Sequence, residues 1–155
     1  MRLTLVPDAT IAKLVPSHAN VEDYKRLRAR MWEIEPVLNA DEVEKILDDQ
    51  EDWAVFVACI DGHGCVGFLE VWLREYAEGA SSSPVGYLEG WFVEPEFRCQ
   101  GIGRSLVIAG EDWARQAGCT EMASDSEVDN VGSIRAHQQM GYREVERIVC
   151  FLKSL

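Results

Sequence analysis

The stretch Arg98-Cys-Gln-Gly101-Ile-Gly103-Arg104 is the clearest structural signal in this sequence. It follows an apolar run that ends at Val93, and it opens a segment with helical apolar spacing that reaches Ala117. Glycines let a backbone approach a ligand closely, and the first N–H groups of a helix have no partner within the helix. The stretch therefore predicts a strand, a tight loop and a helix, with an anion such as a pyrophosphate at the helix start.

Other phosphate-binding loops do not fit this stretch. The sequence contains no G-x-x-x-x-G-K-[ST], and residues 101–110 do not supply G-x-G-x-x-G after the first strand of a βαβ unit. Taken alone, the stretch has two interpretations, an anion site or a helix start with two flexible residues.

Helical and strand patterns alternate around the loop, which indicates a mixed α and β fold. Asp61-Gly62 between two apolar runs predicts a hairpin, and Pro36 is expected to end the first helix. Along 86–94 the period of two puts Tyr87, Glu89, Trp91 and Val93 on one face unless a bulge intervenes. The expected helices are 20–32, about 40–49, 101–117 and about 129–140, and the expected strands are 53–60, 64–73, 86–94, 120–125 and 144–152, the last closing the sheet.

Size and cysteine usage suggest one domain, residues 1–155, in the cytoplasm. The chain is 47% hydrophobic, which is enough for a sizeable core. Five cysteines form an odd set without a C-x-x-C pair or metal-ligand spacing, so we expect reduced thiols and no metal. The stretch Met1–Asp8 carries a charge early, and no apolar run approaches the roughly 18 residues of a membrane span.

The net charge limits the classes of binding partner that are expected. With 27 acidic against 15 basic residues the formal charge is −12, so we expect neither nucleic acid nor a membrane as a partner and favour a cationic substrate. The segments between Arg74 and Arg98 and between Arg115 and Arg135 contain acidic residues but no Lys or Arg. If the fold joins these two acidic tracts, a negative pocket lies beside a small anion site.

A second motif is Asn130-Val-Gly-Ser133-Ile-Arg-Ala-His137, followed by Gly141-Tyr142. This motif and the loop resemble the coenzyme A-binding segments of the GNAT acetyltransferase family. The resemblance implies an α+β fold, with a central mixed, mostly antiparallel sheet of about six to seven strands flanked by about four helices. It also implies acetyl-coenzyme A as co-substrate.

Four further stretches are Ser82-Ser-Pro84, Tyr87-Leu-Glu-Gly-Trp-Phe-Val93, Gly118-Cys-Thr-Glu-Met-Ala-Ser-Asp125 and Gly141-Tyr-Arg-Glu-Val-Glu-Arg147. Together with Leu27-Arg-Ala-Arg-Met-Trp32, they resemble the aminoglycoside 6′-N-acetyltransferases within that family. This resemblance implies acetyl transfer to the 6′-amine of a cationic aminoglycoside, antibiotic resistance and a homodimer. Two alternatives stay open: another amine acceptor, such as a polyamine, a small amine or a protein terminus, or a protein that binds coenzyme A or aminoglycoside without turnover.

Acetyl transfer requires a deprotonated amine, a polarised thioester carbonyl and a proton for the departing thiolate. Glu89 is the candidate base, a backbone N–H near Val93 is the implied partner of the thioester oxygen, and His137, where the family often has a tyrosine, is the candidate acid. The resemblance places coenzyme A on Trp91, Phe92, Val93, Arg98, Cys99, Gln100, Gly101, Ile102, Gly103, Arg104 and Asn130. It places the aminoglycoside on Trp32, Glu35, Tyr76, Glu89, Asp125 and Glu146.

Each assignment has a plainer alternative. Glu89 fits a solvated strand position, and Asp125 and Asn130 fit cap and turn positions. Trp113, on the apolar stripe of its helix, is expected in the core. Cys99 is not favoured as a nucleophile, because the sequence places no base for it.

Overall fold

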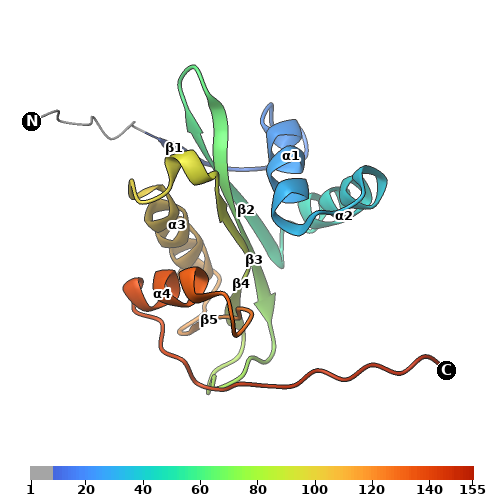
Figure 1. Ribbon diagram of the computed structural model, residues 1–155, viewed down its shortest axis with the longest axis vertical. Coiled ribbons are helices and arrows are strands. Elements are labelled where there is room, and N and C mark those ends of the chain that lie inside the picture. The colour runs from blue at the N-terminus through green and yellow to red at the C-terminus, as the bar shows by residue number, and fades with distance from the viewer. Residues whose placement is uncertain (1–8) are drawn as a thin grey trace, which may run out of the picture.

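The computed structural model describes residues 9–155, so the charged stretch Met1–Asp8 lies outside the described residues. Within that range, five strands form one sheet in the order β1-β2-β3-β4-β5, with four α-helices around it (Figure 1). The elements are β1 (Thr10–Lys13), α1 (Val21–Trp32), α2 (Pro36–Asp48), β2 (Trp53–Ile60), β3 (Gly64–Arg74), β4 (Val85–Val93), the 3₁₀ turn η1 (Pro95–Phe97), α3 (Ile102–Gln116), β5 (Met122–Ser124) and α4 (Val131–Gln139).

The sheet separates two apolar layers. Strands β1 to β4 pair antiparallel, and β5 runs parallel to β4. Helices α1 and α2 cover one face and α3 covers the other (Figure 1). Alternate strand residues therefore enter different clusters, with Phe68 packing under α1 and its neighbour Leu69 under α3. The expected α+β class is confirmed, and Trp113 of α3 packs against the core as expected.

The break between α1 and α2 differs from the expectation at Pro36. Helix α1 ends at Trp32, because Glu33 adopts a left-handed conformation with φ 52°. Pro36 does not end that helix but begins the next one, four residues before the expected start. The first helical position suits proline, since its missing N–H has no intrahelical partner there anyway.

The hairpin predicted at Asp61-Gly62 is confirmed, and it carries an unexpected disulfide. Gly62 takes φ 81°, which a side chain disfavours. Cys59 and Cys65 lie opposite each other in the two strands and are joined by a disulfide. The expectation that all five thiols are reduced is therefore wrong for this pair, because strand pairing brings together two cysteines that the sequence separates by six positions.

The expected last strand, Glu144–Leu152, is wrong. The residues from Arg143 to Leu155, here called the arm, form no helix or strand, and all of them are exposed. Figure 1 shows the arm leaving the body past the end of β5. An alternating apolar pattern forms a strand only where a backbone edge lies beside it, and here a cleft separates the arm from β5. The described sheet consequently has five strands rather than six to seven. It includes the four-residue strand β1, which the sequence pattern did not predict.

Among residues 9–155, no helix is both long and apolar enough to cross a membrane.

Candidate functional site

A β-bulge in β4 shapes the centre of the candidate site. Glu70 of β3 lies opposite Gly90, and the next residue, Val71, lies opposite Leu88, so Glu89 between them has no partner. A bulge bends its strand and re-aims a side chain. It also corrects the single face expected for alternate residues of β4: Trp91 packs in the cluster under α3, whereas Tyr87 packs in a separate cluster.

Glu89 is paired with an arginine that the sequence analysis did not select. Arg74 Nε donates to Glu89 Oε1 at 2.9 Å, and Nη2 of the same guanidinium donates to the same oxygen. The guanidinium carbon lies 3.5 Å from the ring centroid of Tyr87 and 4.9 Å from that of Trp72. Stacking and hydrogen bonding together fix the Arg74 fork, and through it the orientation of the Glu89 carboxylate. Arg74 lies two residues after Trp72 and therefore on the same face of β3. This spacing of an aromatic residue and an arginine was the sequence signal that could have identified Arg74.

Burial raises the pKa of Glu89 above the ordinary glutamate value. The nearby Asp125 carboxylate raises the pKa further, while Arg74 opposes both effects. Asp125 directly follows β5 and is exposed. The structure therefore brings Glu89 and Asp125 close enough for their charges to interact, and it makes Glu89 a stronger base than an exposed carboxylate.

The edge of β4 beyond Glu89 is open towards α4. β5 pairs with β4 only from Gly86 to Leu88, so the remainder of β4 lacks a partner on this side. Such an edge offers backbone N–H and C=O groups to an extended ligand that carries amides. Trp91, on the same stretch, donates from its indole Nε1 to the carbonyl of Gly103 at 3.2 Å. This contact ties the open edge to the first turn of α3.

The loop predicted to bind an anion has the expected backbone. Cys99 and Gly101 take positive φ, 59° and 84°, and no side chain caps α3 at Gly101. The first N–H groups of α3 therefore point out of the helix without a capping partner. A Cβ at Gly101 would meet no atom within 4 Å, so this corner is open. Arg98 Nε donates to the Val93 carbonyl at 2.8 Å, which folds the loop back onto β4.

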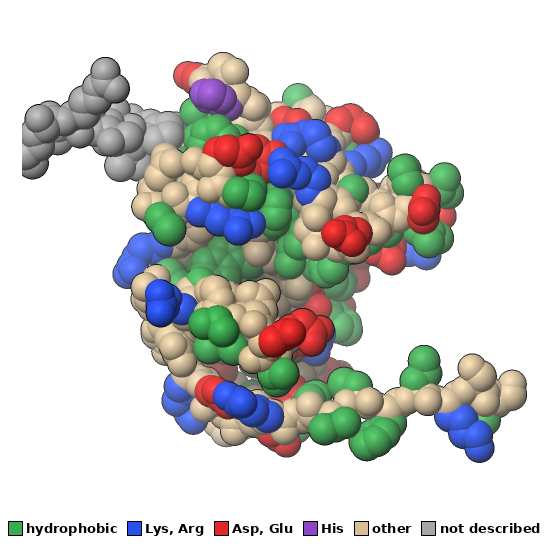
Figure 2. Space-filling model, viewed as in Figure 1, with side chains coloured by type: hydrophobic (Ala, Val, Ile, Leu, Met, Phe, Trp, Pro, Cys, Tyr) green, Lys and Arg blue, Asp and Glu red, His purple; other side chains and the backbone are tan. Residues whose placement is uncertain are grey.

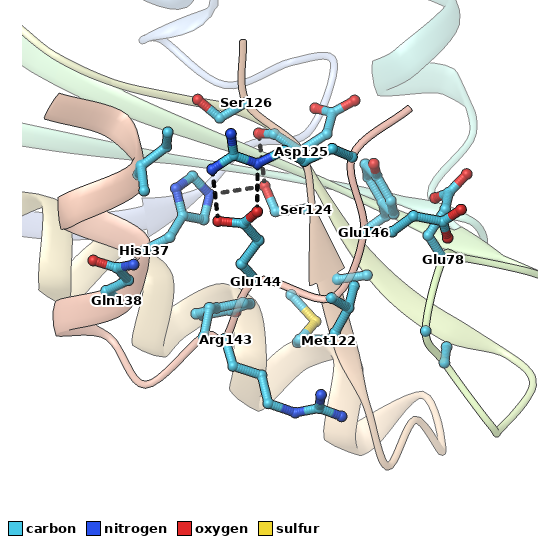
Figure 3. A pocket seen from close by; sticks show the side chains of 18 of the residues that line it. Glu78, Met122, Ser124, Asp125, Ser126, His137, Gln138, Arg143, Glu144 and Glu146 are labelled. Carbon is cyan, nitrogen blue, oxygen red and sulfur yellow. Dashed lines mark hydrogen bonds and ion pairs between the residues drawn. The ribbon is translucent and has the colours of Figure 1, made fainter. Parts of the chain in front are cut away.

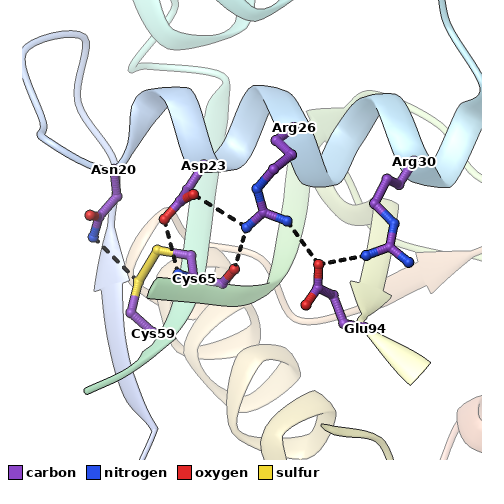
Figure 4. Close-up of polar contacts among 7 residues, drawn as sticks. All are labelled: Asn20, Asp23, Arg26, Arg30, Cys59, Cys65 and Glu94. Atoms are coloured by element: carbon purple, nitrogen blue, oxygen red, sulfur yellow. Dashed lines mark hydrogen bonds and ion pairs between the residues drawn. A yellow bond between two sulfur atoms is a disulfide. The ribbon is translucent and has the colours of Figure 1, made fainter. Parts of the chain in front are cut away.

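Two arginines of α1 hold the residue that joins β4 to the loop (Figure 4). Arg26 Nη1 and Arg30 Nη1 donate to Oε1 of Glu94 at 2.8 and 2.7 Å. The Glu94 N–H donates to the Val66 carbonyl of β3 at 2.8 Å. The end of β4 is thus fixed from two sides, directly before the loop begins.

Asn130 and His137 of the second motif make contacts within the protein. Asn130 caps α4 by accepting from the Ser133 N–H at 3.0 Å, so the cap interpretation is confirmed. His137 Nδ1 lies 2.8 Å from the Ser133 carbonyl, and Nε2 lies 2.9 Å from the Ser124 hydroxyl. A carbonyl only accepts, so the contact with Ser133 requires a proton on Nδ1. The ring also meets the Trp91 indole edge-on, with 5.3 Å between centroids.

A cleft of about 640 Å³ lies between β5, α4 and the arm (Figure 3). Both acidic tracts reach it, which confirms that the fold joins them. Figure 3 shows Glu78 and Glu146 at one end of the cleft and His137 with Gln138 at the other. Its carboxylates come from Glu78, Glu111, Glu121, Asp125, Glu127, Glu144 and Glu146.

The expected aminoglycoside residues do not share one pocket. Asp125 and Glu146 line the cleft, whereas Tyr76 lines a second hollow of about 500 Å³ with Trp72 and Arg74. The Trp32 indole lies on Gly90, beside Glu89. Glu35 is exposed directly before α2.

A model of the Acetyltransferase (GNAT) family matches residues 20–142. The chain is 43% identical over 148 residues to an aminoglycoside N(6′)-acetyltransferase type 1 of Stenotrophomonas maltophilia, which covers 94% of each chain. It is similar to a solved structure of AAC(6′)-Iy with the bisubstrate analogue CoA-S-monomethyl-acetylneamine, with a TM-score of 0.87, 34% identity and coverage of 95% of this chain and 99% of the other. For AAC(6′)-Iy with CoA the TM-score is 0.89, with 33% identity and coverage of 96% and 97%.

Proposed function

Because this chain belongs to the GNAT acetyltransferase family, we propose that it transfers the acetyl group of acetyl-coenzyme A to the 6′-amine of an aminoglycoside. The observation that carries the proposal is Glu89, a carboxylate of raised pKa that a bulge places beside an open strand edge and a glycine-rich helix start. The similarity to aminoglycoside N(6′)-acetyltransferases supports the choice of acceptor.

The reaction is a direct attack without a covalent enzyme intermediate. The amine nitrogen forms a bond to the thioester carbonyl carbon, and the carbon–sulfur bond breaks. The acceptor arrives as an ammonium, so a proton must leave before attack. Glu89 takes this proton, directly or through water, and its raised pKa suits the task.

The co-substrate fits the residues that the resemblance selected. Its pyrophosphate would meet the uncapped N–H groups at the start of α3, where Gly101 leaves open space and Arg98 and Arg104 supply positive charge. Its extended amide arm would run along Trp91–Val93, the open edge of β4. A backbone N–H of that edge near Val93 then holds the thioester oxygen and stabilises the charge that develops on it.

We keep His137 as a candidate donor of the proton for the departing thiolate, in competition with a structural role. Its two ring nitrogens already engage Ser133 and Ser124, which links α4 to β5. Donation requires that the ring become protonated and exchange its bond to Ser124. Proximity supplies much of the rate in direct transfers, so loss of the ring costs little if the role is structural.

The acceptor would lie between the acidic residues and the exposed aromatics. Asp125 and Glu146 offer carboxylates to its ammonium groups, and Glu35 offers a further one at the start of α2. Trp32 and Tyr76 expose 37% and 68% of their surface, which leaves ring faces available to cover sugar faces.

Purified protein mixed with acetyl-coenzyme A, kanamycin and a thiol reagent tests the proposal. We expect thiol release that depends on all components and falls sharply in Glu89→Gln. Thiol release with a polyamine but not with kanamycin would mean that the acceptor is a polyamine rather than an aminoglycoside. Release with neither acceptor would refute the transferase.

We further propose that two copies form a homodimer through the arm. Figure 2 shows hydrophobic side chains along the arm and a hollow between it and the body. These side chains are Val145, Ile148, Val149, Phe151 and Leu152, and each exposes about half of its surface or more. An unpaired extended segment beside an unpaired strand edge favours pairing between copies.

Sedimentation velocity distinguishes a homodimer from a monomer. We expect a species of twice the 17.5 kDa chain mass that becomes monomeric in the double variant Val149→Asp, Phe151→Asp. A monomer at every concentration would contradict the dimer.

We also propose that residues 1–155 act as one domain in the cytoplasm. The Cys59–Cys65 disulfide would there be exposed to reduction by glutathione and thioredoxin.

A further inference from the structure

The indole of Trp32 lies directly on the backbone of β4. A Cβ built on Gly90 would come within 2.5 Å of Trp32 Cη2 and 3.2 Å of Cζ2. Gly90 follows the bulged Glu89, so this ring covers the strand immediately beside the candidate base. The close approach explains a glycine at this position, because any side chain would displace the indole.

An arginine one turn earlier in α1 faces the same ring. The guanidinium carbon of Arg28 lies 4.7 Å from the Trp32 ring centroid, a distance typical of a cation–π contact. The Arg28 side chain is buried, with 8% of its surface exposed, although it carries a charge. Trp32 itself is partly open to solvent. Arg28 therefore lies behind the indole rather than in the open site.

Each nitrogen of the Arg28 guanidinium has its own partner. Nε donates to Glu70 Oε1 at 2.8 Å, Nη1 donates to Asn39 Oδ1 at 3.0 Å, and Nη2 lies 2.7 Å from Glu42 Oε2. Three partners in the plane of the guanidinium leave only its flat faces for other contacts. Its orientation, and hence the plane that it offers to Trp32, is fixed.

Glu70 connects this arginine to the strand under the indole. It lies on β3 directly opposite Gly90, with 1% of its surface exposed, and it also accepts from the Tyr24 hydroxyl. Burial raises the pKa of Tyr24, which keeps that hydroxyl protonated as a donor. Tyr24 and Glu70 thereby fix the position of Arg28 relative to the β3–β4 pair.

We propose that Arg28 is a positioning residue that holds the Trp32 indole on Gly90 and so forms the wall of the acceptor site beside Glu89. The inference rests on the proposed function and deepens it, since the wall would receive a sugar ring that carries an ammonium group. Two carboxylates, Glu42 and Glu70, compensate the charge of Arg28, so the arginine supports the wall without repelling a cationic acceptor.

The alternative is a network that only stabilises the fold. A buried ion pair often contributes little more to stability than apolar residues of similar volume. Packing alone would therefore not require a fork-shaped cation with three partners behind a partly exposed indole. A role limited to stability predicts changes in melting temperature without a change in acceptor binding.

The test is a double-mutant cycle between Arg28→Lys and Trp32→Ala, measured with kanamycin and acetyl-coenzyme A. Lysine keeps the charge but lacks the flat fork, so it should release the ring. We expect each single variant to raise the KM for kanamycin by about three- to tenfold and to leave the KM for acetyl-coenzyme A unchanged. The double variant should be no worse than Trp32→Ala. Arg115→Lys, which changes an exposed arginine of α3, is the matched control and should leave both constants unchanged.

A second variant keeps the inference testable if Arg28→Lys does not fold. Gly90→Ala replaces no hydrogen-bonding partner of Arg28, but its methyl group would come within 2.5 Å of Trp32 Cη2 and 3.1 Å of Phe68 Cε2. The indole must therefore shift, and the KM for kanamycin should rise as it does in Trp32→Ala. Additive effects of Arg28→Lys and Trp32→Ala, or a lower melting temperature with an unchanged KM for kanamycin, would overturn the positioning role. Wild-type protein that releases no thiol with any amine would instead overturn the proposed function, and this inference with it.

Discussion

Arg74 directs two of its nitrogens, Nε and Nη2, to the same oxygen of Glu89, Oε1. One oxygen of the candidate base thus fixes the side chain, while Oε2 is left for a water molecule or an amine. Arg74 lies in turn on the rings of Tyr87 and Trp72. The base is held by a stacked cation, which lowers its pKa, while burial of the carboxylate raises that pKa.

Replacing Glu89 with glutamine removes the proposed base. We expect kcat/KM to fall by about 10²- to 10⁴-fold below neutral pH, where most of the acceptor amine is protonated. The loss should shrink at high pH, since free amine then attacks without help. The pH profile of kcat/KM from pH 5.5 to 9.5 measures this, and a uniform loss at every pH would contradict the role as base.

Replacing Arg74 with methionine should shift the acid limb of the same profile upwards. Arg74 lowers the pKa of Glu89, so its loss lets burial and Asp125 raise that pKa further. A base with a higher pKa is protonated at a higher pH, and activity near pH 6 should fall relative to pH 8. Arg74→Lys keeps a positive charge and serves as the control, with a smaller shift. If the acid limb of Arg74→Met does not move, Glu89 is not the group whose pKa sets that limb.

Gly101→Glu should raise the KM for acetyl-coenzyme A at least tenfold, because it places a negative charge where a pyrophosphate would bind and strains a backbone of φ 84°. Gly118→Glu is the matched control. Gly118 has φ 92° and open space around it, but it follows the C-terminal end of α3, at the opposite end of that helix from Gly101. Steady-state kinetics of both variants separate the strain from the site. Equal KM values for the two would refute the placement of the pyrophosphate.

Asp125→Ala should weaken the use of kanamycin more than that of acetyl-coenzyme A. The exposed carboxylate follows β5 and interacts with Glu89. Its loss removes an attraction for ammonium groups and also lowers the pKa of Glu89 towards its ordinary value. We expect a several-fold higher KM for kanamycin and an acid limb that moves to lower pH. Asp125→Asn, which keeps the shape, should behave alike if charge is the cause.

Reduction of Cys59–Cys65 should leave catalysis intact. The disulfide closes a short loop, so its contribution to the free energy of unfolding is about 2 kcal/mol or less. The double variant Cys59→Ser, Cys65→Ser should melt a few degrees lower and keep both KM values. Thermal denaturation with and without a reductant measures this. A large change in the KM for acetyl-coenzyme A would mean that the hairpin controls the loop through Asp23, Arg26 and Glu94.

Local rules made the conformation of the loop before α3, and α3 itself, predictable. Gly101 must take a positive φ, and the apolar spacing of α3 begins at the next residue. The hairpin at Gly62 follows from the same kind of local rule.

Features that depend on contacts between residues far apart in the sequence could not be predicted from it. The bulge at Glu89 is a property of how β3 and β4 align, and a period of two along one strand cannot reveal it. Arg74 and Arg28 meet carboxylates that lie 15 and 42 residues away, so no short motif announces them. The arm carries a strand pattern from Val145 to Leu152, but the pattern does not specify which edge it joins.

The most direct test of the central claim compares neomycin with paromomycin, a matched pair that carries an amine or a hydroxyl at the 6′ position. Thiol release and mass spectrometry of the products measure acetylation of each compound. We predict rapid transfer of one acetyl group to neomycin and no acetylated paromomycin. Equal acetylation of the two compounds would contradict transfer to the 6′-amine.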